Sequence, residues 1–210
     1  EQPARPGRLP ARGPSRDLAG VCRVRRLAVP GSAASAAALL GLLALSAFLR
    51  TRALDASLWI DEGISAGIAS YPAGEIPGLL RQDGSPPAYY LLLHAWTDLA
   101  GTSEVALRAP SVVFALLTVP AALWAGRSLF GREAGWICAA LAAVLPFLTL
   151  YAQEARMYAL VGLLSVLATT AFTHAFAFGR RRHVPVLAAL LALLLYTHYW
   201  ALFLVLGMLA

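Results

Sequence analysis

Two adjacent carboxylates, Asp61 and Glu62, follow shortly after the first long apolar run of the chain, residues 32–49. Ionised carboxylates are costly inside hydrocarbon, so the pair must lie in water or in a protein cavity at a membrane surface. A carboxylate held there can accept the proton of an attacking hydroxyl group, which is general base catalysis. We therefore start from this pair and ask which other polar groups the chain brings to it.

Two later polar clusters interrupt apolar runs and are expected on the same membrane face. Their members are Gln153, Glu154, Arg156, His198 and Tyr199. Arginine binds phosphate through paired charge-assisted hydrogen bonds, so a guanidinium near a carboxylate fits a transfer reaction from a phosphate-linked donor. Two further arginines, Arg81 and Arg108, are candidates to join the site from the segment between residues 50 and 109.

Each cluster also has an ordinary structural explanation. Acids at a helix start cap free amides and favour its positive end, which would account for Asp61 and Glu62. Glu154 and Arg156 could form an interfacial ion pair, and His198 could be a hydrogen-bonded residue at a helix end. Arg108 could anchor a membrane span at the interface. The convergence of several clusters on one face favours a functional role over these structural explanations, because ionisable residues at membrane depth are usually functional.

The composition predicts a polytopic membrane protein. Hydrophobic residues make up 59% of the chain and charged residues 13%, about half the charged fraction usual for soluble domains. Several uncharged runs reach the roughly 20 residues that cross a bilayer. All seventeen basic residues are arginine, and they concentrate at the ends of the apolar runs. This pattern is a topology signal and does not predict nucleic-acid binding.

The organisation of the chain is expected to be simple. Residues 1–30, rich in Arg, Pro and Gly, are predicted to be a disordered cytoplasmic segment. Residues 31–210 are predicted to be the N-terminal part of a membrane domain, because the chain starts without Met and stops in an apolar run. The two cysteines, Cys22 and Cys138, do not support a disulfide or metal framework.

Arginine placement fixes the predicted topology. Residues 88–100 would form a helix of only about 20 Å, which is shorter than the roughly 30 Å hydrocarbon core. If this segment lies on the outer surface, twelve arginines fall on the side of the N-terminus and five on the other side. If it crossed, this positive-inside bias would nearly vanish. The predicted spans are then residues 32–49, 109–126, 134–152, 157–179 and two segments after 184 that meet near His198.

Short helices are expected in the outer segment between the first two spans. Ile64 and Ile68 stand four apart and predict a helix over residues 63–70. A second short helix is predicted over residues 75–82. The segment 88–100 is predicted to be an amphipathic helix in the membrane interface, with its Tyr and Trp side chains at headgroup level.

Four motifs in a fixed order carry a family resemblance. They are Trp-Ile-Asp-Glu-Gly at 59–63, Gly-Ser-Pro-Pro-Ala-Tyr-Tyr at 84–90, Ala-Leu-Arg-Ala-Pro-Ser at 106–111 and Tyr-Ala-Gln-Glu-Ala-Arg-Met-Tyr at 151–158. In this order they resemble the N-terminal half of a bacterial glycosyltransferase of family 39. Such enzymes are similar to protein mannosyltransferases, the aminoarabinose transferases of lipid A and the RgtA/B/C/D-like group. The resemblance covers about residues 30–210.

The resemblance implies an all-α, GT-C-like helical bundle with interfacial helices in its first outer loop. It also implies a bacterial cytoplasmic membrane enzyme that moves a sugar from a polyprenyl-phosphate donor. The acceptor would be a glycan, lipid or protein outside the membrane. By the same resemblance Asp61 matches the catalytic aspartate of the family, with Glu62 beside it. The loop that contains Glu154 matches the second outer loop, which often carries another acid.

The residues suggest roles of their own for such a reaction. Asp61 is the expected base, Glu62 its support or a metal contact, and Arg156 with Arg81 or Arg108 the phosphate clamp. His198 and Tyr199 are expected to bind substrate. The sequence predicts no particular cofactor. A divalent cation near the two carboxylates is compatible with the sequence, but two acids alone do not establish a metal site. We expect the Asp61 carboxylate and the head of Glu154 or Arg156 to flank one cleft, about 5–12 Å apart.

Two other functions are alternative interpretations of the same sequence. A transporter would place its substrate site near the bilayer midplane, on broken helices or repeats. The polar residues here gather at one surface instead, and the spans are nearly free of charge, which argues against an ion path. A non-catalytic membrane scaffold or lipid-binding subunit is the other alternative, and it would tolerate an Asp61→Asn substitution.

Overall fold

The computed structural model describes residues 32–209, and every regular element in that range is helical. The predicted disorder of residues 1–30 and the position of Cys22 lie outside the described residues. The elements in order are α1 (Ser32–Arg50), α2 (Ile60–Ala69), α3 (Ile76–Asp83), α4 (Ala88–Ala100), α5 (Glu104–Phe130), α6 (Arg132–Val144), α7 (Pro146–Ala152), α8 (Tyr158–Phe172), the π-helical turn η2 (Thr173–Ala177), the 3-10 turn η3 (Arg181–His183), α9 (Val184–Thr197) and α10 (Ala201–Leu209).

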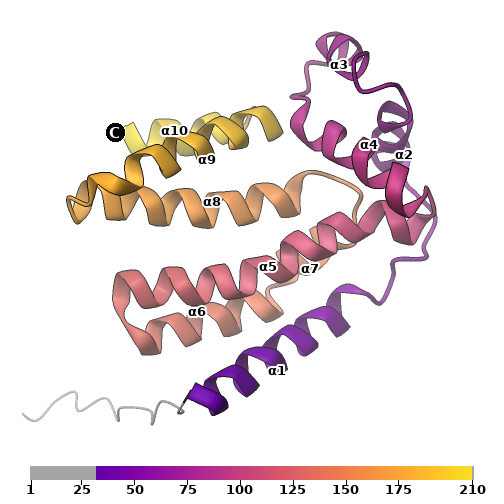
Figure 1. Cartoon of the computed structure of the whole chain (residues 1–210). Helices are drawn as coiled ribbons and strands as arrows, with labels where there is room; N and C mark the ends of the chain where they lie inside the picture. Colours follow the sequence, from indigo (N-terminus) through magenta and orange to yellow (C-terminus); the bar gives the residue numbers. More distant parts are fainter. Residues whose placement is uncertain (1–31, 210) are drawn as a thin grey trace, which may run out of the picture.

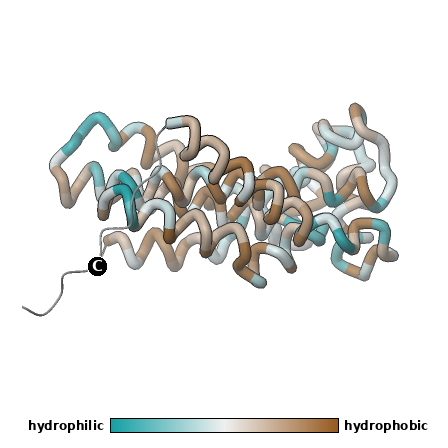
Figure 2. The backbone as a smooth tube through the Cα atoms, turned by 90° about the horizontal axis from the view of Figure 1, so that it is seen from below, coloured by the Kyte–Doolittle hydropathy of each residue, from teal (hydrophilic) through white to brown (hydrophobic). Residues whose placement is uncertain are grey.

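The long helices lie alongside one another, and the short helices α2, α3 and α4 gather at one end of them (Figure 1). Seen from below, hydrophilic residues concentrate at the two ends of the molecule and apolar residues along its length (Figure 2). Within residues 32–209, α1, α5 and the continuous pair α8–η2 are long and apolar enough to cross a membrane. The bent pair α6–α7 would be a fourth span.

The segment 88–100 is a separate helix, α4, with the predicted bounds. The predicted spans are close to the observed helices, but two of them differ from the prediction. The second predicted span begins earlier than expected, at Glu104, because Ser103 caps it by accepting the amide hydrogen of Ala106. The third predicted span is broken: α6 and α7 meet at a bend of 49° next to Pro146.

A buried arginine compensates for that break. Pro146 has no amide hydrogen, so it cannot donate to the carbonyl of Ala142 one turn earlier. Arg50, at the end of α1, donates from Nη2 to this carbonyl at 2.6 Å and from Nη1 to the Ala115 carbonyl at 3.2 Å. The predicted topology includes Arg50 among the five arginines on the outer side, but its side chain is fully buried and joins α1 to α5 and α6.

A second proline, Pro110 in α5, is compensated in the same way. It leaves the Ala106 carbonyl without its helical partner. The indole nitrogen of Trp96 in α4 donates to that carbonyl at 2.9 Å. This bond fastens the short helix α4 onto the first turns of α5.

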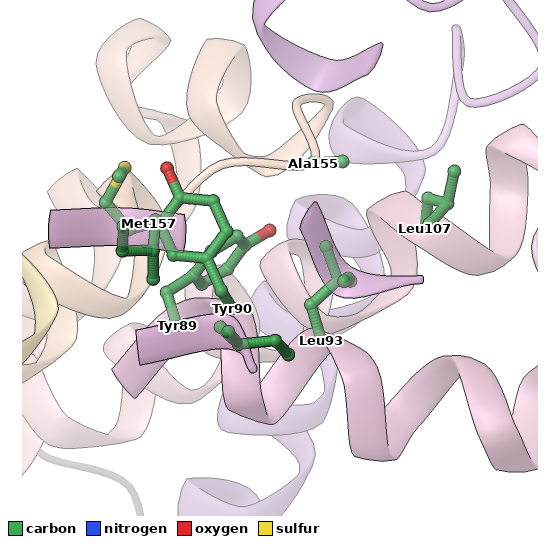
Figure 3. Close-up of a cluster of buried hydrophobic side chains, with 9 residues drawn as sticks. Tyr89, Tyr90, Leu93, Leu107, Ala155 and Met157 are labelled. Carbon is green, nitrogen blue, oxygen red and sulfur yellow. The ribbon is translucent and has the colours of Figure 1, made fainter. Parts of the chain in front are cut away.

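An apolar cluster under α4 positions the loop between α7 and α8. Tyr89, Tyr90 and Leu93 of α4 are buried against Ala155 and Met157 of that loop (Figure 3). Ala155 and Met157 stand on either side of Arg156. Packing of its two neighbours therefore sets where the Arg156 side chain can reach.

Helices α5 and α6 approach so closely that only glycine fits between them. A Cβ atom added at Gly126 would lie 2.8 Å from the Cα atom of Gly135. A Cβ atom added at Gly135 would lie 2.7 Å from the Leu123 carbonyl oxygen. Small residues allow the backbones of two membrane helices to touch in this way. Dispersion forces between the close-packed atoms then stabilise the helix pair.

We expect Gly135→Ala to destabilise the α5–α6 pair by about 1–3 kcal/mol, because the added methyl group meets backbone that cannot move aside. Thermal unfolding of the detergent-solubilised protein should show a lower Tm. Gly41→Ala in α1 is the matched control, since a Cβ atom there meets nothing within 4 Å. Equal Tm values for the two variants would contradict the close-packed interface.

Candidate functional site

A buried ion pair lies at the centre of the end where α2 and α4 gather. Glu62 and Arg108 meet through two hydrogen bonds, from Arg108 Nε to Oε1 at 2.8 Å and from Nη2 to Oε2 at 2.6 Å. Glu62 is fully buried and Arg108 nearly so. The bidentate geometry joins the first turn of α2 to the second turn of α5.

The remaining donors of Arg108 are also occupied. Its Nη1 donates to the carbonyls of Leu54 and Ala56 at 2.8 and 2.6 Å, and its Nη2 reaches the Ser57 carbonyl at 3.3 Å. A guanidinium has five N–H donors, and all five are used here. Arg108 therefore has no donor left for a phosphate, and we withdraw it from the expected phosphate clamp.

Glu62 serves as an anchor for three segments. Besides Arg108, its Oε1 accepts the amide hydrogen of Ala155 at 2.7 Å, and its Oε2 accepts that of Trp59 at 3.3 Å. Burial acts to raise the pKa of Glu62, but the hydrogen bonds from Arg108, Ala155 and Trp59 outweigh it and lower the pKa. Glu62 thus stays ionised and holds the 153–157 loop against α2. The structural explanation of this acid as a helix cap is correct in part.

Asp61, the other half of the pair, is oriented differently. Its side chain is 39% exposed, and its Oδ2 lies 3.7 Å from Nη2 of Arg156. Nη1 of Arg156 also donates to the Asp61 carbonyl and to Ser65 Oγ, both at 3.3 Å. Asp61 and Arg156 thus lie close together, as predicted, but the predicted separation of about 5–12 Å across one cleft is wrong, because the two groups form a direct ion pair.

Arg156, the partner of this carboxylate, also lines an open pocket of about 520 Å³. The pocket is lined by Ser85, Pro86, Arg156, Met157, Tyr158, Val161, His198, Tyr199 and Trp200. Its volume is within the range of roughly 300–1,000 Å³ typical of small-molecule sites. Arg156 lies 5.8 Å from the Tyr158 ring centre, and its buried Nε atom has no hydrogen-bond partner in the described part of the chain.

His198 and Tyr199 reach the pocket from the turn between α9 and α10. The His198 ring lies 5.7 Å from the Tyr158 ring and 5.0 Å from the Tyr199 ring, centre to centre. Burial, and then the charge of Arg156, lower the pKa of His198, so a neutral imidazole is favoured. Two of the predicted substrate-binding residues are therefore brought to the same cavity as Arg156.

Glu154 lies in the same loop but makes no ion pair among residues 32–209. Its Oε2 atom is buried without a hydrogen-bond partner there. Burial raises the pKa of Glu154, and the negative charge of Glu62 raises it further. A carboxyl group whose pKa is raised near other charged groups is a candidate for a functional site. The structure thus places Glu154 near the charges of Asp61, Glu62 and Arg156.

Arg81 is not brought to these residues. It is exposed in the last turn of α3, where a cation favours the negative end of the helix. Its side chain forms no hydrogen bond or ion pair with another described residue, and we withdraw it from the clamp as well. Among residues 32–209, no three His, Cys, Asp or Glu side chains are grouped to hold a metal ion, and the expected metal contact Glu62 is already bound by Arg108.

Sequence reasoning missed several contributors to this site. Ser65 bonds to Arg156, while Tyr158 and Trp200 line the pocket. Ser65 stands one turn after Asp61 on α2, so its spacing from Asp61 could have indicated it. Tyr158 follows Arg156 by two residues in a motif that we quoted, but a tyrosine near a span end is more often an interface anchor.

Comparison with known proteins gives one match. The family model described as dolichyl-phosphate-mannose-protein mannosyltransferase matches residues 84–210, which is more than half of the chain. The matched region contains Arg108, Glu154, Arg156 and His198, whereas Asp61 precedes it. Neither a curated protein nor a solved structure matches the chain. The contacts of Asp61 and Glu62 with residues 155 and 156 connect the unmatched part to the matched part.

We expect Arg108→Leu to cost about 3–5 kcal/mol of folding free energy at neutral pH, because it leaves the Glu62 charge buried and unpaired. In the wild type the pKa of Glu62 is lowered, so its stabilisation is present above the unfolded pKa of about 4.3 and is lost as pH falls. In the variant the pKa of Glu62 should be raised. The difference in unfolding free energy between the wild type and the variant should therefore become smaller as pH falls.

Chemical unfolding in detergent at several pH values measures this effect. Arg81→Leu is the control, since the Arg81 side chain is exposed and bonds to no other described residue. The anchoring role of the Glu62–Arg108 pair would be contradicted by either of two results. The unfolding free energies of Arg108→Leu and the wild type could differ little at neutral pH, or their difference could increase as pH falls.

Proposed function

The chain belongs to the dolichyl-phosphate-mannose-protein mannosyltransferase family and is therefore a membrane glycosyltransferase, and we propose that it uses a polyprenyl-phosphate sugar as donor. The sugar goes to an acceptor hydroxyl of a glycan, lipid or protein outside the cytoplasmic membrane. The observation that carries this proposal is the ion pair of Asp61 and Arg156 beside an open pocket at one end of the apolar helices.

Asp61 is the proposed general base. It is the partly exposed member of the Asp-Glu pair, whereas Glu62 is fully buried and saturated with hydrogen bonds. During transfer the acceptor oxygen forms a bond to the anomeric carbon, and its proton passes to the Asp61 carboxylate. An exposed carboxylate can meet an acceptor hydroxyl, and a buried one cannot.

Arg156 is the proposed phosphate ligand. The bond from the anomeric carbon to the phosphate oxygen breaks during transfer, and the departing lipid phosphate gains negative charge. A guanidinium stabilises that charge through short charge-assisted hydrogen bonds. Arg156 has an unpartnered Nε atom and lines the pocket, so it can exchange part of its contact with Asp61 for the phosphate. The loss of this contact would also free Asp61 to act as base.

The pocket suits the sugar and the start of the lipid chain. Tyr199 and Trp200 at its rim are largely exposed, and aromatic rings with one apolar and one polar side suit a membrane interface. The neutral His198 can donate or accept a hydrogen bond to a sugar hydroxyl. We propose these residues as substrate contacts and Glu62 with Arg108 as positioning residues.

The arginine distribution supports a site on the outer face. Arg127, Arg132 and the run 180–182 lie at the end of the spans away from Asp61, where the positive-inside rule places the cytoplasm. The short helix α4 borders the pocket loop and is too short to cross the bilayer. A donor lipid could reach such a site from the outer leaflet.

We expect Asp61→Asn to reduce sugar transfer by about 10²–10⁴-fold, because the amide keeps the shape but cannot accept the proton. The measurement is transfer of radiolabelled sugar from polyprenyl-phosphate donors by membranes that contain the full-length protein. Asp98→Asn is the control, since Asp98 is an exposed carboxylate of α4 that pairs with His94. Undiminished transfer by folded Asp61→Asn protein would remove Asp61 from the base role.

The membrane orientation can be tested separately by labelling single cysteines with an impermeant maleimide, in a background that lacks Cys22 and Cys138. We expect Glu75→Cys to react from outside intact cells, because the arginine asymmetry places α2–α4 there. Phe130→Cys, exposed at the end of α5, should react only after the cells are opened. Labelling with the opposite pattern would place the Asp61 site in the cytoplasm.

A further inference from the structure

The end of the bundle opposite Asp61 carries a second arrangement that the transfer reaction does not use. The chain runs from Tyr158, next to Arg156, through α8 and η2 for about 30 Å and then turns at Gly179. Gly179 has a φ of 65°, a left-handed conformation that favours glycine. The turn brings the three arginines 180–182 to the start of α9.

The first of these arginines belongs to the fold. Arg180 Nη1 lies 3.4 Å from Nδ1 of the buried His174, and its guanidinium stands 5.8 Å from the Phe178 ring. The other ring nitrogen of His174 lies 3.0 Å from Ser128 Oγ of α5. This network ties the turn to α5, so the positions of the neighbouring residues are fixed.

The next two arginines are not used in this way. The side chains of Arg181 and Arg182 are exposed, and neither side chain forms a hydrogen bond or ion pair with another described residue. The ion pairs found within residues 32–209 all involve Glu62, Asp61 or Asp98, none of which belongs to this turn. Two guanidinium groups without a carboxylate partner leave an unbalanced positive charge at this end of the helices.

An apolar groove begins directly at Arg181. It has a volume of about 540 Å³ and is lined by Ala175, Phe176, Gly179, Arg181 and Val184. Phe176 is 62% exposed and Val184 is 40% exposed. The groove thus combines one charged group with a wall of apolar side chains on membrane helices. A free phosphate would pair only with the Arg181 charge, and an uncharged lipid would contact only the apolar side chains.

We propose that this groove binds an anionic phospholipid, with the headgroup phosphate on Arg181 and an acyl chain against Phe176 and Val184. Charge complementarity selects the anion, since basic pockets between membrane helices attract acidic headgroups. Arg182 adds to the local potential. The site is independent of the transferase reaction, because it lies at the other end of α8 from Arg156. A purely topological role for these arginines would need charge but no groove.

Native mass spectrometry of the full chain in detergent tests the proposal. The probes are phosphatidylglycerol, phosphatidylcholine with the same acyl chains, and glycerol 3-phosphate. We expect phosphatidylglycerol to be retained at least about fivefold better than phosphatidylcholine, and glycerol 3-phosphate not to compete at equal concentration. Arg181→Gln should lose this preference, whereas Arg181→Lys should keep most of it. Phe176→Ala should weaken binding of both lipids.

Arg132→Gln is the matched control, because it removes one positive charge at the same end from a residue that contacts Ser35 and does not line the groove. It should bind phosphatidylglycerol like the wild type. The proposal is overturned if Arg132→Gln and Arg181→Gln lose binding equally, since only net charge would then matter. It is also overturned if the two lipids bind alike, or if glycerol 3-phosphate displaces phosphatidylglycerol at equal concentration.

Discussion

The arrangement of the site depends on the buried ion pair between Glu62 and Arg108. Two charges removed from water at a membrane surface persist only when each is well bonded. Glu62 meets this condition with Arg108 and the amides of Trp59 and Ala155, and Arg108 meets it with the backbone of residues 54–57. These bonds join α2, α5 and the 153–157 loop in one unit. Asp61 and Arg156 both belong to that unit.

This constraint separates two roles that adjacent acids might otherwise share. Glu62 faces inward on the first turn of α2 and supports the structure, while Asp61, one residue earlier, is partly exposed and meets Arg156. The apolar cluster under α4 holds the neighbours of Arg156, and Trp96 holds α4 to α5. A base and a phosphate ligand are thereby presented next to a pocket of about 520 Å³ by elements that have little freedom to shift.

The sequence allowed the helices and the meeting of Asp61 with Arg156 to be predicted, because apolar runs, arginine asymmetry and motif order carry that information. The bounds of α4 and the turn near His198 followed from the same patterns. The partners of Glu62 and Arg108 did not, since residues 46 apart meet only through tertiary packing. Arg50 was misjudged for a related reason: a span-end arginine usually marks topology, and only the fold shows that it bonds to the carbonyl freed by Pro146.

In the proposed reaction Arg156 receives the lipid phosphate while Asp61 remains beside the transferred sugar. An experimental structure of the full-length protein with a bound polyprenyl-phosphate sugar measures this directly. We expect a phosphate oxygen within about 3 Å of an Arg156 nitrogen, and the anomeric carbon on the side of Asp61. A phosphate bound instead at Arg181, or one that leaves Arg156 still paired only with Asp61, would contradict it.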